Sequence, residues 1–171
     1  MVAFLGGTIG NFDPEQRARF LAGVHDLLGA DGGSLLVGSD LIKPAEVLVP
    51  AYNDSAGVTA DFNKNVLRVL NRELGATFDV DAFEHVALWR AEEERIEMRL
   101  RATSPQTVPL PGVGVEVSFA EGEELLTEIS TKFSREGISA ELRDAGFRIS
   151  GQWFDPLERY AVTLAETLPA S

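Results

Sequence analysis

The chain has 171 residues, enough for one domain with a sizeable hydrophobic core. Its 15 basic and 27 acidic residues give a formal net charge of −12, so it repels phosphate backbones and nucleic acid is excluded as an expected partner. The chain has no cysteine, which excludes disulfides and thiolate metal sites, and no apolar stretch of the roughly 20 residues that span a membrane. We expect a soluble, cytoplasmic protein with no membrane partner.

The first forty residues predict a β-α-β unit. An apolar run, Met1–Leu5, ends in the glycine-rich turn Gly6–Asn11. Asp13–Gln16 has the pattern of a capping box with proline at the first helical position, and the helix it starts ends at Gly29. Ser34–Asp40 reads as a buried parallel strand. Because α/β enzymes place ligand groups where parallel strands end, the Gly6–Asn11 turn is the first candidate site.

The middle of the chain alternates between helical and strand periodicities. Ala120–Phe133 mixes the two signals, so its structure is left open. The other predicted elements are a short helix over 44–54, a longer helix from Val58 to Leu74 ended by Gly75, a turn or one helical turn at Phe78–Phe83, a hairpin of Glu84–Arg90 and Arg95–Ala102, a loop over Pro105–Gly114, and a third strand in chain order, Val115–Phe119.

The last forty residues predict a helix and two strands. The helix begins at Ser134 and is capped by Gly146, and the strands Phe147–Phe154 and Arg159–Ala165 are joined by a turn at Asp155-Pro156. Sheets of the class I methyltransferase type usually close in this way, with the last strand antiparallel. This likeness concerns the fold alone.

Four side chains could bind a ligand, and each has a plainer interpretation. The amide of Asn11 can hold an amino or carboxylate group, or the residue can simply shape the turn through a positive φ. Tyr52 can donate to a carboxylate or serve as a packing residue. If residues 125–130 are extended, Glu128 and Ser130 point to the same side and could clamp an imidazole; in a helix they face apart.

Other polar residues have plainer roles by spacing. His25 and His85 have no partner at a catalytic or metal-binding spacing, and the acidic groups Glu92–Glu94 and Glu121–Glu124 are expected to be solvated turns. Met98 lies on a predicted strand and would by default belong to the core. No residue is expected to bind a metal or to act as a nucleophile.

A series of stretches in order along the chain resembles the histidine-specific methyltransferases of ergothioneine biosynthesis, which use S-adenosylmethionine to trimethylate the α-amino group of L-histidine. The matching stretches cover nearly the whole chain and are Phe4–Asn11, Asp40–Lys43, Ala51–Thr59, Phe62–Leu67, Asn71–Leu74, Phe83–Ala87, Glu94–Met98 and Leu126–Phe133.

The resemblance implies a role for each candidate residue. Asn11 would hold the amino and carboxylate end of histidine and Tyr52 its carboxylate, while Glu128 and Ser130 would grip the imidazole and Met98 would line the pocket. Methyl transfer by positioning needs no catalytic residue in the sense of a proton or covalent carrier. Gly6 and Gly7 would make at most a peripheral contact with S-adenosylmethionine.

The resemblance also implies an α/β fold divided into three segments. Residues 1–43 and 134–171 would form the C-terminal part of a class I, Rossmann-like methyltransferase sheet, and residues 44–133 an inserted α+β substrate-binding domain. The glycine-rich cofactor loop of the family has no counterpart here, since the chain contains no Gly-x-Gly-x-x-Gly, and it would belong upstream of Met1.

Three functions therefore stay open. The chain can be the histidine-binding half of a histidine methyltransferase that works with a missing N-terminal half on a separate chain. It can instead be an inactive fragment or non-catalytic binding module. Finally, it can belong to a related N-methyltransferase that acts on another amino acid.

Overall fold

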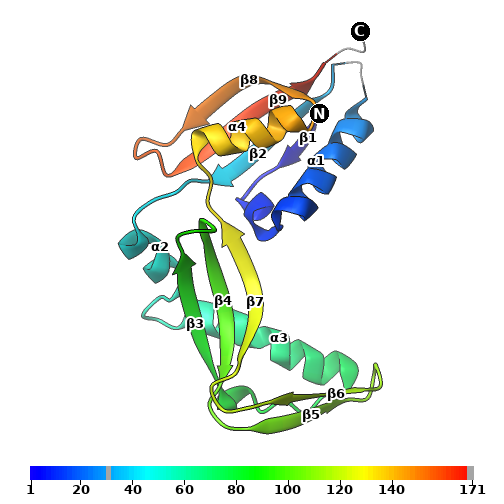
Figure 1. The fold of residues 1–171 in the computed structure, drawn as a ribbon, viewed down its shortest axis with the longest axis vertical. Helices are drawn as coiled ribbons and strands as arrows, with labels where there is room; N and C mark the ends of the chain where they lie inside the picture. The colour runs from blue at the N-terminus through cyan, green and yellow to red at the C-terminus, as the bar shows by residue number, and fades with distance from the viewer. Residues whose placement is uncertain (30–31, 169–171) are drawn as a thin grey trace. The chain divides into compact units, whose positions relative to one another are not determined.

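The computed structural model describes residues 1–29 and 32–168, and the chain divides into two compact units (Figure 1). The first unit comprises residues 1–44, 91–95 and 129–171, and the second comprises residues 45–90 and 96–128. Residues 91–95 and 129–133, which the resemblance assigns to the insertion, lie in the first unit. The elements are β1 (Val2–Phe4), η1 (Thr8–Asn11), α1 (Pro14–Leu28), β2 (Ser34–Asp40), α2 (Ala45–Tyr52), α3 (Val58–Leu74), η2 (Val80–Ala82), β3 (Phe83–Arg90), β4 (Arg95–Ala102), β5 (Gln106–Leu110), β6 (Val115–Phe119), β7 (Glu124–Thr131), α4 (Arg135–Asp144), β8 (Phe147–Phe154) and β9 (Tyr160–Thr167).

The first unit is built on a four-stranded sheet with the order β1-β2-β9-β8. β1 and β2 are parallel, whereas β9 is antiparallel to both of its neighbours. The predicted β-α-β unit and the antiparallel close are therefore confirmed. The predicted capping box is also present, because Asp13 Oδ1 accepts from the Gln16 amide at 2.8 Å and Gln16 Oε1 accepts from the Asp13 amide at 3.0 Å.

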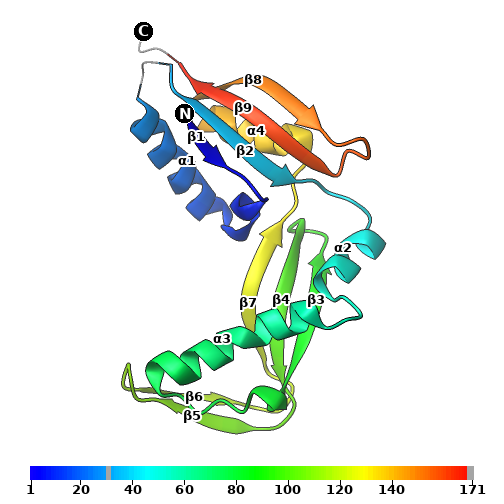
Figure 2. The ribbon, with the colours of Figure 1, turned by 180° about the vertical axis from the view of Figure 1, so that it is seen from behind.

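Both helices of this unit cover one face of the sheet. Figure 2 shows the unit from the other side, where β2 and β9 are drawn in front of α4. Burial follows the alternation of the strands, so that inward residues of β2 and β9 pack against apolar residues of the helices. This core contains Leu21, Val24, Leu35, Val37, Ile138, Leu142, Ala161 and Ala165.

A buried arginine joins the two helices. Arg17, on α1, is 4% exposed, and its Nε and Nη2 donate to the two carboxylate oxygens of Glu141 on α4 at 2.9 Å each. Its Nη1 donates to the Phe12 carbonyl at 2.7 Å. The guanidinium therefore fixes the chain leaving η1 as well as the packing of α1 against α4.

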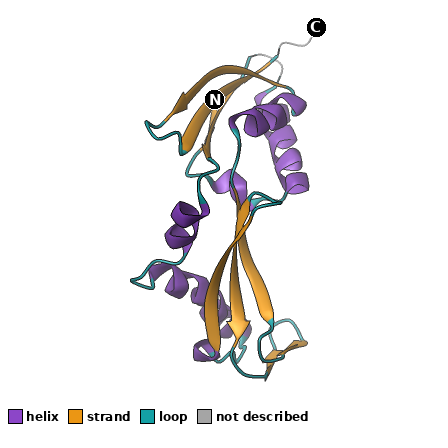
Figure 3. Ribbon diagram, turned by 60° about the vertical axis from the view of Figure 1, so that its left-hand side comes forward, coloured by secondary structure: helices purple, strands orange, loops and turns teal. Residues whose placement is uncertain are grey.

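The second unit contains a three-stranded sheet, β3-β4-β7, and the β5–β6 hairpin. The long twisted strands stand out in Figure 3, and the arrows of β3, β4 and β7 alternate in direction in Figure 1. α3 ends at Gly75, which takes a left-handed conformation with φ 64°. Among the described residues, no helix is long and apolar enough to cross a membrane. The core of this unit contains Leu67, Ala76, Phe78, Phe83, Leu100, Ala102, Val108 and Leu110.

The structure corrects the prediction of a loop over Pro105–Gly114. Gln106–Leu110 is a strand, β5, paired antiparallel with β6, and Val108 and Leu110 are buried while Pro109 is exposed. Each strand of a two-stranded sheet is an edge, where a proline can turn its missing donor away from the partner. The predicted strand Val115–Phe119 is confirmed as β6, and the strand that joins β3 and β4 in their sheet is β7.

Candidate functional site

The turn after β1 is shaped by glycines. Gly6 and Gly7 have φ values of 83° and 75°, a backbone conformation that residues other than glycine rarely adopt. Asn11 is not among the described residues with positive φ. The interpretation of Asn11 as a residue that merely provides a left-handed turn is therefore wrong. Asn11 is exposed at the end of η1, so its amide is accessible to a ligand.

Gly10 brings this turn against the end of β7. A Cβ built on Gly10 would lie 2.6 Å from the carbonyl oxygen of Thr131 and 3.2 Å from its nitrogen. Only glycine permits such a close approach of two backbones. Asn11 and Ser130 are each one residue away from this contact, so two of the predicted site residues are positioned by the same packing within the first unit.

An ionic network that local sequence patterns did not predict lies at the ends of β2 and β7. Lys132, whose side chain is 0% exposed, lies with its Nζ 2.8 Å from Asp40 Oδ2 and donates to Ser130 Oγ at 2.7 Å. Lys43 Nζ donates to the other oxygen of Asp40 at 2.5 Å. The backbone joins the same segments, since the Phe133 amide donates to the Asp40 carbonyl at 2.9 Å. Ser130, 7% exposed, is thus held by a buried cation.

Tyr52 lies at the last residue of α2 and is half-buried. Its carbonyl oxygen is 2.8 Å from His85 Nε2, and His85 Nδ1 is 2.9 Å from the side-chain nitrogen of Asn63. Because an amide nitrogen only donates, Nδ1 accepts and Nε2 carries the proton that is donated to Tyr52. His85 therefore fixes the end of α2 near Tyr52, a structural role consistent with the absence of a catalytic spacing.

Glu128 and Ser130 lie on β7, so the structure resolves the ambiguity over residues 120–133 in favour of a strand. Residues two apart in a strand project from the same side, which is the arrangement that an imidazole clamp requires. Glu128 is half-buried and lines a pocket of about 230 Å³ in the second unit. The other lining residues come from α3 and β7 and are Phe62, Asn63, Asn65, Val66 and Thr127.

Two features make this pocket suited to a small, partly apolar ligand. Phe62 is 65% exposed and Val66 39% exposed, so α3 presents an aromatic ring and an aliphatic group beside the carboxylate of Glu128. The side chain of Asn63 is fixed by a second hydrogen bond, in which its nitrogen donates to the Arg99 carbonyl at 3.1 Å. The sequence did not indicate this exposure, because the helical spacing of Val58, Phe62 and Val66 puts all three on an apolar stripe that would be expected to be buried.

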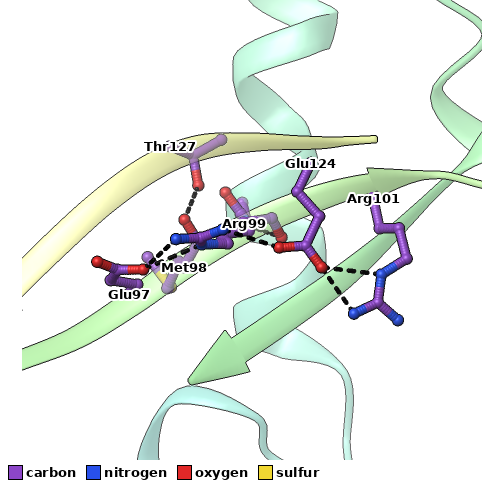
Figure 4. Close-up of polar contacts among 7 residues, drawn as sticks. Glu97, Met98, Arg99, Arg101, Glu124 and Thr127 are labelled. Carbon is purple, nitrogen blue, oxygen red and sulfur yellow. Dashed lines mark hydrogen bonds and ion pairs between the residues drawn. The ribbon is translucent and has the colours of Figure 1, made fainter. Parts of the chain in front are cut away.

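Met98 is 3% exposed on β4, and its carbonyl accepts from Thr127 Oγ1 on β7 at 2.8 Å. Figure 4 shows an ionic network beside it, in which Arg99 joins Glu97 and Glu124. Arg101 also donates to Glu124, at 2.7 and 2.9 Å. Hydrogen bonds from Arg101 and then from Arg99 lower the pKa of Glu124. This network fixes β4 against β7.

The predicted site residues are divided between the units. Gly6, Gly7, Asn11 and Ser130 belong to the first unit, and Tyr52, Met98 and Glu128 belong to the second. Within the described part of the chain, no group of three or more acidic or histidine side chains could hold a metal ion.

Comparison with known proteins decides the family. The pattern of the histidine-specific, SAM-dependent methyltransferases matches residues 1–167. The chain belongs to this family. Its mixed α/β fold is that of the C-terminal part of a class I methyltransferase.

Relatives of the family support the assignment. Over 165 residues the chain is 54% identical to a histidine N-alpha-methyltransferase of Mycolicibacterium smegmatis and 50% identical to one of Mycobacterium tuberculosis, covering 96% of this chain and 51% of each relative. An L-tryptophan methyltransferase of Psilocybe serbica is 28% identical over 94% of this chain and 45% of its own length. The chain thus spans about half the length of the curated relatives it matches.

Proposed function

We propose that the chain takes part in methyl transfer from S-adenosylmethionine to the α-amino group of L-histidine, forming hercynine for ergothioneine biosynthesis, and that it supplies mainly the histidine-binding half of the enzyme. The observation that carries the proposal is the match of residues 1–167 to the histidine-specific family. The extended conformation of β7 supports it, because Glu128 and Ser130 project from one side.

Each proposed contact uses a complementary group. The Asn11 amide and the Tyr52 hydroxyl hold the amino acid end of the substrate, while Glu128 accepts from the ring N–H and Ser130 contacts the other ring nitrogen. The resemblance also assigns Met98 to the substrate site; it is 3% exposed on β4 and is not among the residues that line the 230 Å³ pocket. Histidine is selected because an analogue without ring nitrogens leaves these polar groups unpaired.

S-adenosylmethionine would supply an activated methyl group on a sulfonium. The residues present fit only a peripheral part of its site: Gly6 and Gly7 expose backbone at the end of β1, and a Cβ on Gly7 would lie 3.8 Å from Asp40 Cβ. We propose that the main cofactor contacts come from the N-terminal half found in the relatives, on the same or a separate chain. The residues of this chain orient the neutral amine and exclude water.

A direct test measures methyl transfer to L-histidine by the purified chain, alone and mixed with the N-terminal half of the M. smegmatis relative. We expect transfer in the mixture. No transfer and no histidine binding in either case would support an inactive fragment or binding module instead. Micromolar binding of S-adenosylmethionine by the isolated chain would contradict the proposed division of the cofactor site.

The substitution Glu128→Ala tests the imidazole contact. It should weaken histidine binding about 10–100-fold, the loss of a hydrogen bond to a charged group, while cofactor binding by the mixture changes little. Glu116→Ala, an exposed glutamate on β6, is the matched control. Equal losses for both ligands by calorimetry would count against the assignment.

A second candidate substrate is another amino acid, which the similarity to the L-tryptophan methyltransferase favours. Competition between histidine and tryptophan in the same assay separates the two. Preference for tryptophan that survives Glu128→Ala would favour the second candidate.

A further inference from the structure

The end of α2 is weakly held by the helix itself. α2 has 8 residues, Ala45–Tyr52, with Leu48 as its one buried residue, and Pro50 in its last turn has no amide hydrogen to donate. Short isolated helices are marginal in water, and the carbonyl groups of a last helical turn have no partner within the helix. The position of Tyr52, the last residue of α2, therefore depends on contacts from outside the helix.

The ring of His85 supplies such a contact from β3, the strand on which α2 packs. His85 Nε2 lies 2.8 Å from the Tyr52 carbonyl oxygen, and His85 Nδ1 lies 2.9 Å from the side-chain nitrogen of Asn63 on α3. The same nitrogen donates to the Arg99 carbonyl on β4 at 3.1 Å. Because a carbonyl only accepts, this last hydrogen bond fixes which way the Asn63 amide is turned.

These hydrogen bonds leave one tautomer for the neutral ring of His85. The Asn63 nitrogen donates, so His85 Nδ1 accepts, and Nε2 carries the proton that is donated to the Tyr52 carbonyl. The ring thus caps the last residue of α2 and is itself fixed by α3 and β4. All four residues belong to the second unit.

We propose that His85 is a positioning residue for the substrate, because by capping α2 it fixes Tyr52 with respect to Glu128. This inference rests on the proposed function, in which Tyr52 holds the carboxylate of histidine and Glu128 holds its ring. Glu128 lies in the same unit, next to Thr127, whose Oγ1 donates to the Met98 carbonyl on β4 at 2.8 Å. The two contacts are then held at a set separation before the substrate arrives, so binding does not have to order α2.

Two substitutions separate the two ends of the ring. Glutamine has a side-chain nitrogen that can replace Nε2 and donate to the Tyr52 carbonyl, whereas the shorter asparagine can replace only Nδ1. The dissociation constant of L-histidine is measured by calorimetry, with the full chain mixed with the N-terminal half of the M. smegmatis relative. His85→Asn should raise the constant about three- to tenfold, the effect of one neutral hydrogen bond, and His85→Gln less than about twofold.

His25, on α1 of the first unit, is the other of the two histidines in the chain. His25→Asn is the matched control and should leave the dissociation constant of L-histidine within about twofold of the wild type, since no proposed contact depends on it. The affinity for S-adenosylmethionine should stay the same in all three variants.

A double-mutant cycle with Tyr52→Phe distinguishes positioning from a general loss of structure. Tyr52→Phe removes the hydroxyl proposed to hold the carboxylate but keeps the main-chain carbonyl that His85 caps. If His85 acts through Tyr52, His85→Asn should raise the dissociation constant by less than about twofold in this background. The same increase in both backgrounds would overturn the inference, as would a Tyr52→Phe variant that binds histidine as tightly as the wild type.

Nitrogen-15 NMR of the wild type gives a second measurement, which also decides if His85→Asn fails to fold. His25→Asn leaves His85 as the one histidine of the chain and so assigns its ring signals, which should show a protonated Nε2. Because coupling between two sites is reciprocal, unlabelled L-histidine should slow exchange of the Nε2 hydrogen with water about three- to tenfold.

The two proposals can fail separately. A protonated Nδ1, or an Nε2 hydrogen whose exchange is unchanged by bound histidine, overturns the inference and leaves the proposed function standing. A wild-type protein with the expected tautomer that binds no histidine overturns the proposed function, and the positioning role with it.

Discussion

Gly10→Ala should damage both the fold and the proposed binding of histidine. The new Cβ would lie 2.6 Å from the Thr131 carbonyl oxygen, where ordinary contact begins at 3.4 Å, so either η1 or the end of β7 must move by about 0.8 Å. No flexible side chain can give way here, because the atoms that the Cβ would meet belong to the backbone of Thr131. Overpacking of this kind costs about 1–3 kcal/mol, and a loss of about 2 kcal/mol lowers the Tm of a chain of this size by roughly 4–8 °C.

The same displacement acts on the site through Asn11 and Ser130, the neighbours of the two residues in contact. A misplacement of about 1 Å can reduce a rate by about 100-fold, so in the proposed activity assay with the N-terminal half present, kcat/KM for histidine should fall by at least about tenfold. Gly23→Ala is the control: Gly23 is exposed on α1, and a Cβ added there would have no atom within 4 Å, so alanine should raise stability by about 0.5–1 kcal/mol. Wild-type Tm and kcat/KM in Gly10→Ala would refute the reasoning.

Two further predictions concern charge. Glu141→Ala should destabilise the first unit by about 3–5 kcal/mol, more than Arg17→Met does. The reason is that Glu141→Ala leaves the Arg17 guanidinium, whose side chain is 5% exposed, without its carboxylate, whereas the Glu141 side chain is 33% exposed and can be hydrated. Equal losses of unfolding free energy for the two variants in urea would contradict this. Asp54 accepts from the amides of Thr59 and Val58, and these bonds, led by that of Thr59, lower its pKa to about 2. These bonds should therefore stabilise the start of α3 at pH values above the unfolded-state pKa of ~3.9, and the contribution should be lost as the pH falls toward about 2. In an NMR titration, Asp54→Asn should remove the pH dependence of the Val58 and Thr59 amide signals. An Asp54 pKa at its ordinary value would contradict the assignment.

Local sequence signals predicted the elements whose causes are local. The capping box of α1 and the glycine that ends α3 are short-range patterns, and both are present. β5 was missed because Pro109 interrupts an alternation that the burial of Val108 and Leu110 otherwise follows. A proline is informative against a central strand but not against an edge.

Contacts between distant residues could not be predicted from one sequence. Arg17 and Glu141 are 124 positions apart, and the pairing of Lys132 with Asp40 likewise joins separate elements. Nothing in the spacing of such residues marks them as partners, because their proximity depends on how β2, β7 and the helices pack. The resemblance indicated Glu128 and Ser130 as site residues, but the cation behind Ser130 required the structure.

The segment from Glu128 to Phe133 serves two purposes through the alternation of an extended chain. Glu128 and Ser130 carry the proposed recognition of the ring and Lys132 donates to Ser130, while Thr131 meets Gly10 and Phe133 belongs to the apolar core. Residues on the two sides are therefore coupled: the packing of Thr131 and Phe133 fixes the register that directs the polar groups. A shift of one residue would exchange the two sets of side chains, placing Ser130 and Lys132 where Thr131 and Phe133 now pack. The proposed specificity of the site thus depends on the register of this segment as much as on the identity of its polar residues.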